Sequence, residues 1–367
     1  MSKRGFVDAK AFSNALRKAS KVPKKSEIPA LSEVHVQVRD GRCFLTATDL
    51  NTWMSVELPA RGDDLAFVFS RTKDVERACR HFDGELAIEL IESGGEKNRR
   101  LKIVMQCGAR SGEFNALLPE LYPEKPTVEA ETEFSVDAKK LLERVERVRY
   151  ATEAPGFQTP TARACVQFSG DQIYAVDGQR VSCDADPDMS IPQPFLAPAE
   201  PLSYLKLLDG EQASIQLGGR YIQITDGSVC LLFRRLEEAT VFNLEQAIPK
   251  SFADEFYVSP KEFLKELAYL KEFSPSGAKP YVRFCGGELL LSSFAGRYRT
   301  HVALDGRSEI IFGFDLRHMK DALEQFRQED QVKVKVASKY APFVIEAAGR
   351  RDFAMVCPVR LKEEQAA

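Results

Sequence analysis

Three hexapeptides of one pattern decide the fold: Val7-Asp8-Ala9-Lys10-Ala11-Phe12, Val136-Asp137-Ala138-Lys139-Lys140-Leu141 and Val258-Ser259-Pro260-Lys261-Glu262-Phe263. In each, Asp or Ser follows an extended residue and offers a side-chain oxygen to the free N–H groups of a helix's first turn. The apolar residues that follow recur at three- and four-residue spacing, as on the buried face of a helix. Each hexapeptide therefore predicts a strand that runs into a capped helix.

Weaker copies of the pattern lie midway between these segments, with cap positions at Ser70, Pro198 and Asp315. The six cap positions are spaced 56 to 67 residues apart along the chain. Similarity at a nearly fixed period is the signature of a repeated structural unit. We therefore expect six copies of one unit.

Alternating apolar and polar residues follow the helices, at 34–38, 86–90, 213–217 and 332–336. A period of two indicates half-buried antiparallel strands. Turns between strands are predicted at Asp40-Gly41, Asp83-Gly84 and Asp226-Gly227. Each unit is then a strand, a helix and about three strands, and two units make a domain of ordinary size. We expect an α+β fold with three similar domains at residues 1–130, 131–251 and 252–367.

Composition limits the classes of function. The 367 residues include 51 basic and 54 acidic side chains, a net charge of -3, so the chain is not basic overall. Its eight cysteines are far apart and form no C-x-x-C pair, which argues against zinc and redox motifs. The sequence has no membrane-length apolar run and no secretory leader, so we expect a cytoplasmic protein without a membrane partner.

An enzyme is the rival class that the sequence supports least. The four histidines, His35, His81, His301 and His318, are scattered singly. No P-loop, G-x-S-x-G, H-E-x-x-H or dinucleotide-binding fingerprint occurs in the sequence. We therefore predict no catalytic residue, metal site or cofactor.

Four further motifs give the chain a resemblance to a known family. They are Leu45-Thr46-Ala47-Thr48-Asp49-Leu50, Leu118-Pro119 with Tyr122-Pro123, Tyr174-Ala175-Val176-Asp177-Gly178-Gln179-Arg180-Val181, and Val356-Cys357-Pro358-Val359-Arg360-Leu361. In their order and spacing over three repeated domains, the chain resembles the bacterial DNA polymerase III beta subunit, the sliding clamp.

The resemblance implies a head-to-tail homodimer whose six domains close a ring around duplex DNA, with helices lining the hole and sheets outside. It implies a non-catalytic processivity factor, associated with the bacterial nucleoid, that needs a clamp loader and tethers the polymerase catalytic subunit. Other partners would carry short clamp-binding peptides. The alternative within this fold is a paralogue that acts as a specialised scaffold or regulator, without a general role in processivity.

Charge is segregated in a way that fits DNA inside such a ring. Windows 8–21, 70–83 and 136–149 together carry a net charge of +6, although the whole chain carries -3. Positive side chains attract phosphates without reading bases. The later helices barely repeat this excess, so solvated faces with paired charges remain the alternative. The predicted DNA contacts, of which Lys24 and Lys25 match the family's DNA-touching loop, are Lys10, Arg17, Lys21, Lys24, Lys25, Arg71, Arg77, Arg80, Lys140, Arg144, Arg147 and Arg149.

The resemblance also implies a hydrophobic cleft that binds partner peptides between the second and third domains. Carried over position by position, its residues are Ala162, Val176, Gly178, Gln179, Arg180, Val181, Phe242, Gln246, Ala247, Tyr340, Pro342, Met355, Cys357, Pro358, Val359 and Arg360. Apolar walls would hold leucine or aromatic anchors, and Arg180 and Arg360 would supply charged donors at the rim. The family commonly has Met at positions 357 and 359, so the loss of flexible side chains predicts a narrower set of peptides.

Two further features complete the expectations. Phe114 and Leu117 on one side, and Leu270 and Phe273 on the other, are candidate dimer-interface residues, with ordinary core packing as the alternative. Residues 362–367 extend past the family's usual end, and the sequence leaves open whether they cover part of the cleft.

Overall fold

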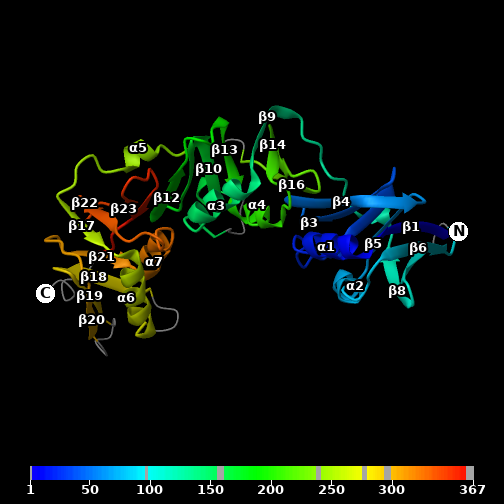
Figure 1. Cartoon of the computed structure of the whole chain (residues 1–367), viewed down its shortest axis with the longest axis horizontal. Coiled ribbons are helices and arrows are strands. Elements are labelled where there is room, and N and C mark those ends of the chain that lie inside the picture. The colour runs from blue at the N-terminus through cyan, green and yellow to red at the C-terminus, as the bar shows by residue number, and fades with distance from the viewer. Residues whose placement is uncertain are drawn as a thin grey trace. The chain divides into compact units, whose positions relative to one another are not determined.

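The computed structural model describes residues 2–95, 98–154, 161–236, 241–274, 279–292 and 299–360. The chain forms two compact units (Figure 1). Unit 1 comprises Met1–Leu141 with Glu200–Glu237, and unit 2 comprises Leu142–Ala199 with Glu238–Ala367. The boundary between Leu141 and Leu142 falls inside a helix, because the strand before that helix belongs to a sheet of unit 1 and the strand after it to a sheet of unit 2.

The predicted repeat is present six times in the element order. The first two copies are β1 (Ser2–Asp8), α1 (Ala9–Ala19), β2 (His35–Arg39), β3 (Arg42–Thr48), β4 (Thr52–Gly62) and β5 (Leu65–Phe69), α2 (Thr72–Cys79), β6 (Glu85–Ser93), β7 (Arg100–Cys107), β8 (Arg110–Leu117). The next two are β9 (Ala130–Asp137), α3 (Ala138–Arg149), β10 (Cys165–Gly170), β11 (Gln172–Val176), β12 (Arg180–Ala185) and β13 (Ile191–Pro198), α4 (Ala199–Leu202), β14 (Gln212–Gly218), β15 (Tyr221–Thr225), β16 (Val229–Arg234). The last two are β17 (Asp254–Val258), α6 (Pro260–Glu272), β18 (Tyr281–Cys285), β19 (Glu288–Ser292), β20 (Arg299–Ala303) and β21 (Phe312–Asp315), α7 (Leu316–Glu324), β22 (Val332–Val336), β23 (Phe343–Ala347), β24 (Phe353–Val356). A short helix, α5 (Leu244–Ala247), precedes the fifth copy.

The predicted caps are mostly confirmed. The side chains of Asp8, Asp137, Ser259 and Asp315 each accept a hydrogen bond from a backbone N–H in the first turn of the following helix. Ser70 is not a cap: α2 begins after Arg71, and the Ser70 hydroxyl donates to the Asn115 carbonyl instead.

Two of the three predicted turns join strands. Asp40 and Gly41, with φ of 52° and 74°, connect β2 to β3 in the left-handed conformation that a two-residue hairpin turn requires. Asp226-Gly227 connects β15 to β16. Asp83-Gly84 lies between α2 and β6, so its prediction as a turn between strands is wrong.

The strands pair antiparallel in three sheets. Unit 1 holds the order β1-β6-β7-β8-β5-β2-β3-β4-β16-β15-β14-β9, and β1 also pairs with β4. At that closure a side chain at Gly62 would place its Cβ 2.3 Å from the Arg4 carbonyl oxygen, so only glycine fits. Unit 2 holds the order β13-β10-β11-β12-β24-β23-β22-β17 and the separate order β20-β19-β18-β21.

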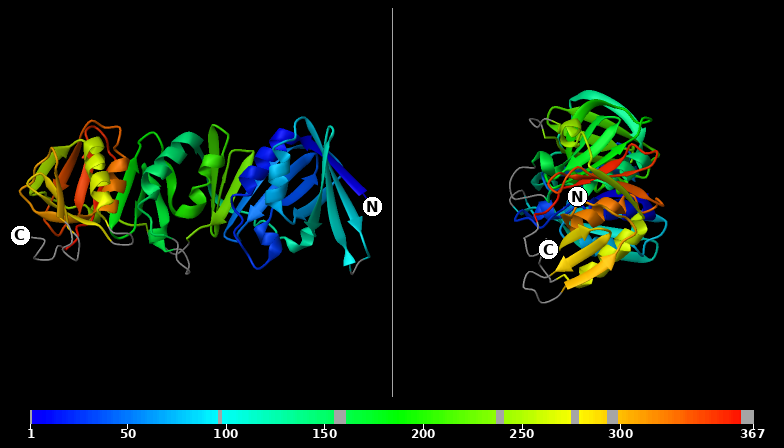
Figure 2. Two further views of the ribbon diagram at one scale, coloured as in Figure 1. Left: turned by 90° about the horizontal axis from the view of Figure 1, so that it is seen from below. Right: turned by 90° about the vertical axis from the view of Figure 1, so that its left-hand side faces the viewer.

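The helices cover the strands of their own unit. In unit 1, α1 contacts α2 and packs on β3 and β4 (Figure 2). In unit 2, α6 and α7 lie side by side, and their buried residues share one core with strands β17 to β24. Each long helix therefore has one face in a core and one face toward solvent.

Equivalent strands in the repeats have equivalent roles. Each four-stranded group ends in an outer strand: β4, β8, β12, β16, β20 or β24. Within the chain, β4 pairs with β16 and β12 pairs with β24, both antiparallel. Among the described residues, β20 has only β19 as a neighbour, and β8 has β7 along its length and β5 only at Ala116 and Leu117. Two outer strands thus retain an open edge.

Among the described helices, none combines the length and apolar character needed to cross a bilayer.

Candidate nucleic-acid and peptide surfaces

The α1–β2 loop and α2 enclose a basic groove in unit 1. Its volume is about 820 Å³, and it is lined by Ser20, Pro23, Lys24, Lys25, Ser32, Glu33, Arg71, Thr72, Lys73, Asp74, Glu76, Arg77 and Arg80. Five of the predicted DNA contacts lie here, together with Lys73, which the sequence analysis did not single out. Six cations and three carboxylates line the groove, so its own charge is positive.

Most cations in this groove already have carboxylate partners. Arg71 and Arg77 share Asp74, and Arg80 pairs with Glu76 at 2.8 Å. Lys24 lies 3.0 Å from Asp49 and 2.7 Å from Glu200.

The two carboxylate partners of Lys24 also change its pKa. Burial alone would lower the pKa of Lys24, but its hydrogen bonds to Glu200 and Asp49 outweigh burial and raise the pKa well above its ordinary value. Within the described part of the chain, Lys25 and Lys73 are exposed and have no carboxylate at ion-pair distance. The local excess of positive charge therefore depends largely on these two lysines.

The remaining predicted contacts on α1 and α3 differ in availability. Lys10 pairs with Asp83 at 2.9 Å on the surface, and this hydrogen bond raises the pKa of Lys10. Arg17, Lys21 and Lys140 are exposed, and Arg149 pairs with Glu146. These positions stay predictions for DNA contact.

Arg144 is a correction to the predicted DNA contacts. Its side chain is only 4% exposed and pairs with Asp184, which is 2% exposed. It also donates to the carbonyl oxygens of Asp171 and Asp184. A guanidinium buried in this way cannot reach a phosphate from α3.

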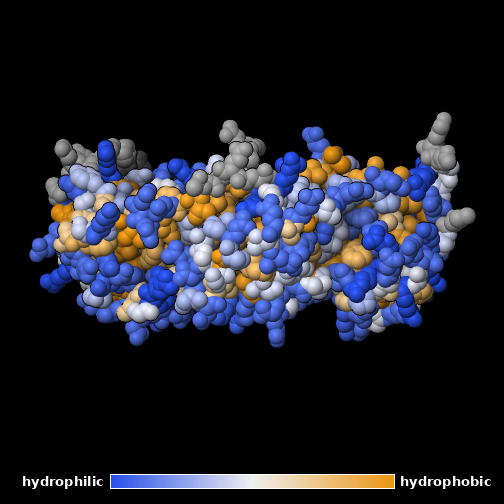
Figure 3. Space-filling model, turned by 90° about the horizontal axis from the view of Figure 1, so that it is seen from above, coloured by the Kyte–Doolittle hydropathy of each residue, from blue (hydrophilic) through white to orange (hydrophobic). Residues whose placement is uncertain are grey.

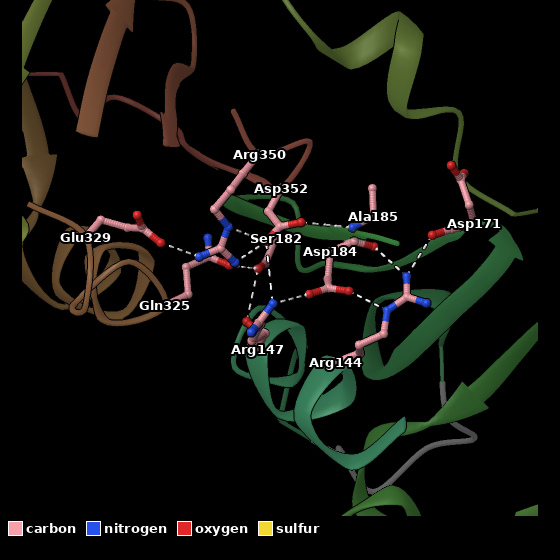
Figure 4. A network of polar contacts seen from close by, with 10 residues as sticks. All are labelled: Arg144, Arg147, Asp171, Ser182, Asp184, Ala185, Gln325, Glu329, Arg350 and Asp352. Carbon is pink, nitrogen blue, oxygen red and sulfur yellow. Dashed lines mark hydrogen bonds and ion pairs between the residues drawn. The ribbon is translucent and has the colours of Figure 1, made fainter. Parts of the chain in front are cut away.

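Arg144 belongs to an ionic network within unit 2 (Figure 4). Arg147 pairs with Asp184 and, at 3.5 Å, with Asp352. Asp352 pairs with Arg350, which also pairs with Glu329 at 2.6 Å. The network thereby joins α3, β12, the β23–β24 hairpin and the segment after α7 through side chains that the sequence places far apart.

The network generates a stability prediction. Replacing Asp184→Asn removes the only carboxylate paired with buried Arg144 in the described part of the chain, so we expect unfolding free energy to fall by about 3–5 kcal/mol. The control Glu324→Gln breaks the exposed Arg327–Glu324 pair and should cost about 1 kcal/mol or less. Urea unfolding followed by circular dichroism measures both. Equal stability of the Asp184→Asn variant and the wild type would contradict the role given to the network.

A second, smaller apolar cluster in unit 2 contains four of the sixteen residues of the predicted cleft. Its buried members are Tyr174, Val176, Val181, Cys183, Leu244, Val344 and Met355, and Val241, Ala247, Ile248, Phe252 and Phe353 pack against them. We call this set the linker cluster, because residues 241–252 join the fourth repeat to the fifth. The structure therefore places Val176, Val181, Ala247 and Met355 of the predicted cleft in one apolar cluster.

The walls of the predicted cleft are largely covered by the chain itself. Val176, Val181 and Met355 are 8%, 6% and 3% exposed. Larger apolar side chains stand at the surface near by in the sequence: Phe242 is 39% exposed and Tyr340 is 69% exposed. In the space-filling view, apolar surface occurs as separate patches among polar side chains (Figure 3). Exposed apolar surface among the predicted cleft residues therefore lies on aromatic side chains more than on the buried walls.

The other predicted cleft residues vary in exposure. Gly178, Gln179, Gln246 and Arg360 are exposed, and Ala162, Pro342, Cys357, Pro358 and Val359 are partly buried. The Cys357 N–H donates to the Gln179 carbonyl and the Val359 N–H to the Gly313 carbonyl, both at 2.8 Å. These bonds hold the last described segment between the β11–β12 turn and β21. Residues 362–367, whose relation to the cleft the sequence leaves open, lie outside the described residues.

Arg180 is a second correction. Its guanidinium pairs with Asp177 at 2.9 Å and Asp321 at 2.6 Å and lies over the Tyr150 ring, 5.7 Å from the centroid. The side chain is 12% exposed. Arg180 therefore links the β11–β12 turn to α7, and the predicted rim donor is not free to bind a peptide.

The predicted interface residues separate into surface and core. Phe114 is partly buried on β8, and Leu117 packs beside Ala30, Val68 and Tyr122. Leu270 is fully buried in the core of unit 2, so its assignment to a dimer interface is wrong.

At the end of α6, Phe273 is 37% exposed, and its ring lies 5.2 Å from that of Tyr269, which is 46% exposed. Tyr269 was not among the predicted interface residues, although its four-residue spacing from Phe273 places both on one face of α6.

Six strand–helix–three-strand repeats, four of them joined in pairs through their outer strands, give this chain the fold of the DNA sliding clamps. Solved structures match over almost the whole chain. The DNA polymerase sliding clamp from Caulobacter crescentus has a TM-score of 0.84 and 17% identity, covering 98% of this chain and 100% of that one. The DNA polymerase III beta subunits from Thermotoga maritima and Pseudomonas aeruginosa both have TM-scores of 0.82, with 19% and 16% identity, and the same coverage.

No protein-family model and no curated protein sequence matches the chain. The likeness to the beta subunits is therefore one of fold, and the predicted α+β clamp fold is confirmed at that level.

Proposed function

We propose that this chain is a non-catalytic DNA sliding clamp, a processivity factor that encircles duplex DNA. The observation that carries the proposal is the pattern of outer strands: four are paired across the repeats, and among the described residues β20 and most of β8 have an open edge in equivalent positions. In a head-to-tail homodimer, β20 of each copy pairs with β8 of the other. Such a heterologous contact closes after two copies and leaves no open outer strand.

The proposed division of labour follows from this ring. Three domains per copy, at residues 1–130, 131–251 and 252–367, supply six domains to the ring. Helices face the DNA, and a clamp loader opens the ring in the bacterial cytoplasm. The linker cluster and its exposed aromatics bind short peptides of the polymerase and other partners. A polymerase held in this way stays at high effective concentration beside the DNA, so weak contacts sustain long synthesis.

A specialised scaffold with the same fold is the second candidate function. The paired cations of the α1–α2 groove favour this candidate, because they leave less positive surface for DNA. The largely covered cleft walls favour it too, because they leave less apolar surface for peptides. The DNA and peptide measurements below distinguish the two candidates.

The homodimer predicts a mass twice the 41.1 kDa of the chain in sedimentation equilibrium. Tyr269→Asp places a charge on the exposed surface of α6, the helix that contacts β20, and should raise the dimer dissociation constant at least about tenfold. Tyr340→Asp adds the same charge at the most exposed of the large apolar side chains and should leave the dimer intact. A wild-type monomer at micromolar concentration would contradict the proposed ring.

DNA binding should depend on the two lysines without carboxylate partners. Each phosphate contact adds about 0.9 to the slope of log affinity against log salt, so Lys25→Gln with Lys73→Gln should reduce that slope by about 1.8. Arg42→Gln with Glu57→Gln removes a neutral pair of unit 1 outside the groove and should leave the slope unchanged. Fluorescence anisotropy of a labelled duplex over 50–200 mM salt measures both. Equal slopes for the wild type and the double-lysine variant would remove these residues from the DNA surface.

Peptide binding should depend on the exposed aromatic residues near the linker cluster. We expect micromolar affinity, about -8 kcal/mol, for a fluorescent peptide of the Gln-x-x-Leu-Phe type that the family resemblance implies. Tyr340→Ala should weaken binding about tenfold, since exposed aromatics are frequent hot spots. Tyr257→Ala, an exposed aromatic on β17, is the control and should bind as the wild type does. If the folded wild type binds no such peptide, the tethering role fails.

A further inference from the structure

Two buried polar side chains form hydrogen bonds with the backbone of one linker residue. Gln167 on β10 and Tyr174 on β11 are directly opposed in the antiparallel register. They are 1% and 2% exposed. The Phe242 N–H donates to Gln167 Oε1 at 2.6 Å, and the Tyr174 hydroxyl donates to the Phe242 carbonyl at 2.8 Å. Both backbone groups of Phe242 are therefore bonded by this one cross-strand pair.

These two hydrogen bonds fix the linker backbone at a position that has no regular secondary structure. Phe242 lies in neither a helix nor a strand, so no neighbouring backbone fixes its direction. Buried glutamine is uncommon unless its polar atoms are bonded, and here its carbonyl oxygen has a defined partner. Burial raises the pKa of Tyr174 to about 12, so its hydroxyl remains a neutral donor at neutral pH.

The chain beyond Phe242 is fixed as well. The Asn243 side chain accepts a hydrogen bond from the Gln246 N–H at 3.3 Å and caps α5. Leu244, 7% exposed, enters the linker cluster. Residues 242–247 thus run over unit 2 into α5 along a defined path (Figure 1), and Phe242, whose backbone is held on this path, is 39% exposed.

An exposed aromatic side chain on a fixed backbone position beside an apolar cluster suits a binding surface. A ring on a free linker would lose conformational entropy on binding, about 0.5–1.5 kcal/mol for each ordered side chain. We propose that Gln167 and Tyr174 are positioning residues that preorganise Phe242 as a fixed wall for the partner peptide. This assignment rests on the peptide-binding function proposed above.

The test removes one oxygen atom from the full-length protein. Tyr174→Phe deletes the hydroxyl and keeps the ring, so the linker cluster remains packed. We expect the dissociation constant for the Gln-x-x-Leu-Phe-type peptide to rise about threefold to tenfold, in anisotropy titrations. Tyr204→Phe is the matched control, because the Tyr204 hydroxyl also donates to a backbone carbonyl, that of Lys21 in unit 1, and its loss should leave peptide affinity unchanged.

A double-mutant cycle separates positioning from a general loss of structure. In the Phe242→Ala background no ring remains to be positioned, so adding Tyr174→Phe should change affinity less than about twofold. A purely structural effect would weaken binding equally in both backgrounds. Gln167→Met keeps the side-chain length without the acceptor and should behave as Tyr174→Phe does.

The outcomes distinguish this assignment from the function on which it rests. Equal binding by the wild type and Tyr174→Phe would overturn the assignment alone, as would an undiminished effect in the Phe242→Ala background. Absence of binding by the folded wild type would overturn the peptide-binding function and, with it, the assignment.

Discussion

Backbone pairing at the outer strands is the constraint on which the rest of the structure depends. A strand with an open edge presents unpaired N–H and C=O groups, so every four-stranded group needs a neighbour. The chain meets this need twice, through β4 with β16 and β12 with β24. These pairings also explain why the molecule forms two compact units although the repeats group in pairs: the third and fourth repeats give strands to sheets in both units.

Polar interactions in unit 2 supplement this backbone pairing. The buried pair of Arg144 with Asp184 and the half-buried pair of Arg180 with Asp321 connect α3, β12 and α7 around the β12–β24 pairing. Desolvated charges stabilise little by themselves, but a charge left without its partner is costly, so such pairs specify one arrangement of the elements. The linker is also fixed by buried polar groups. The side chains of Gln167 and Tyr174 provide the hydrogen bonds to the Phe242 backbone that a neighbouring strand would otherwise supply.

The sequence predicted what is local and repeated. Caps at Asp8 and Ser259 and the Asp40-Gly41 turn depend on residues a few positions apart, so their patterns were sufficient. The errors involve distant partners. Arg144 had the spacing of a solvent-facing cation, but its partner Asp184 is 40 residues away, and Arg180 pairs with Asp321, 141 residues away.

Dependence on distant contacts also explains why Leu270 was wrongly assigned to an interface and why Gln167 was not singled out. Leu270 fits a helix face equally well in a core or at an interface, and only tertiary packing assigns it to the core. Gln167 carried a usable signal, a polar residue within the apolar run Cys165–Phe168, but its bond to Phe242 spans 75 residues. More of the fold than of the site could thus be predicted from the sequence. The repeats depend on residues close together in the chain, whereas the site depends on contacts between residues far apart in it.

Ring closure is the central claim, and images of single particles test it most directly. Negative-stain electron microscopy of the purified full-length protein should show closed rings of two copies around a central hole. Class averages dominated by single copies, or by dimers without a hole, would contradict the account, because the open edges of β8 and β20 would then not complete each other.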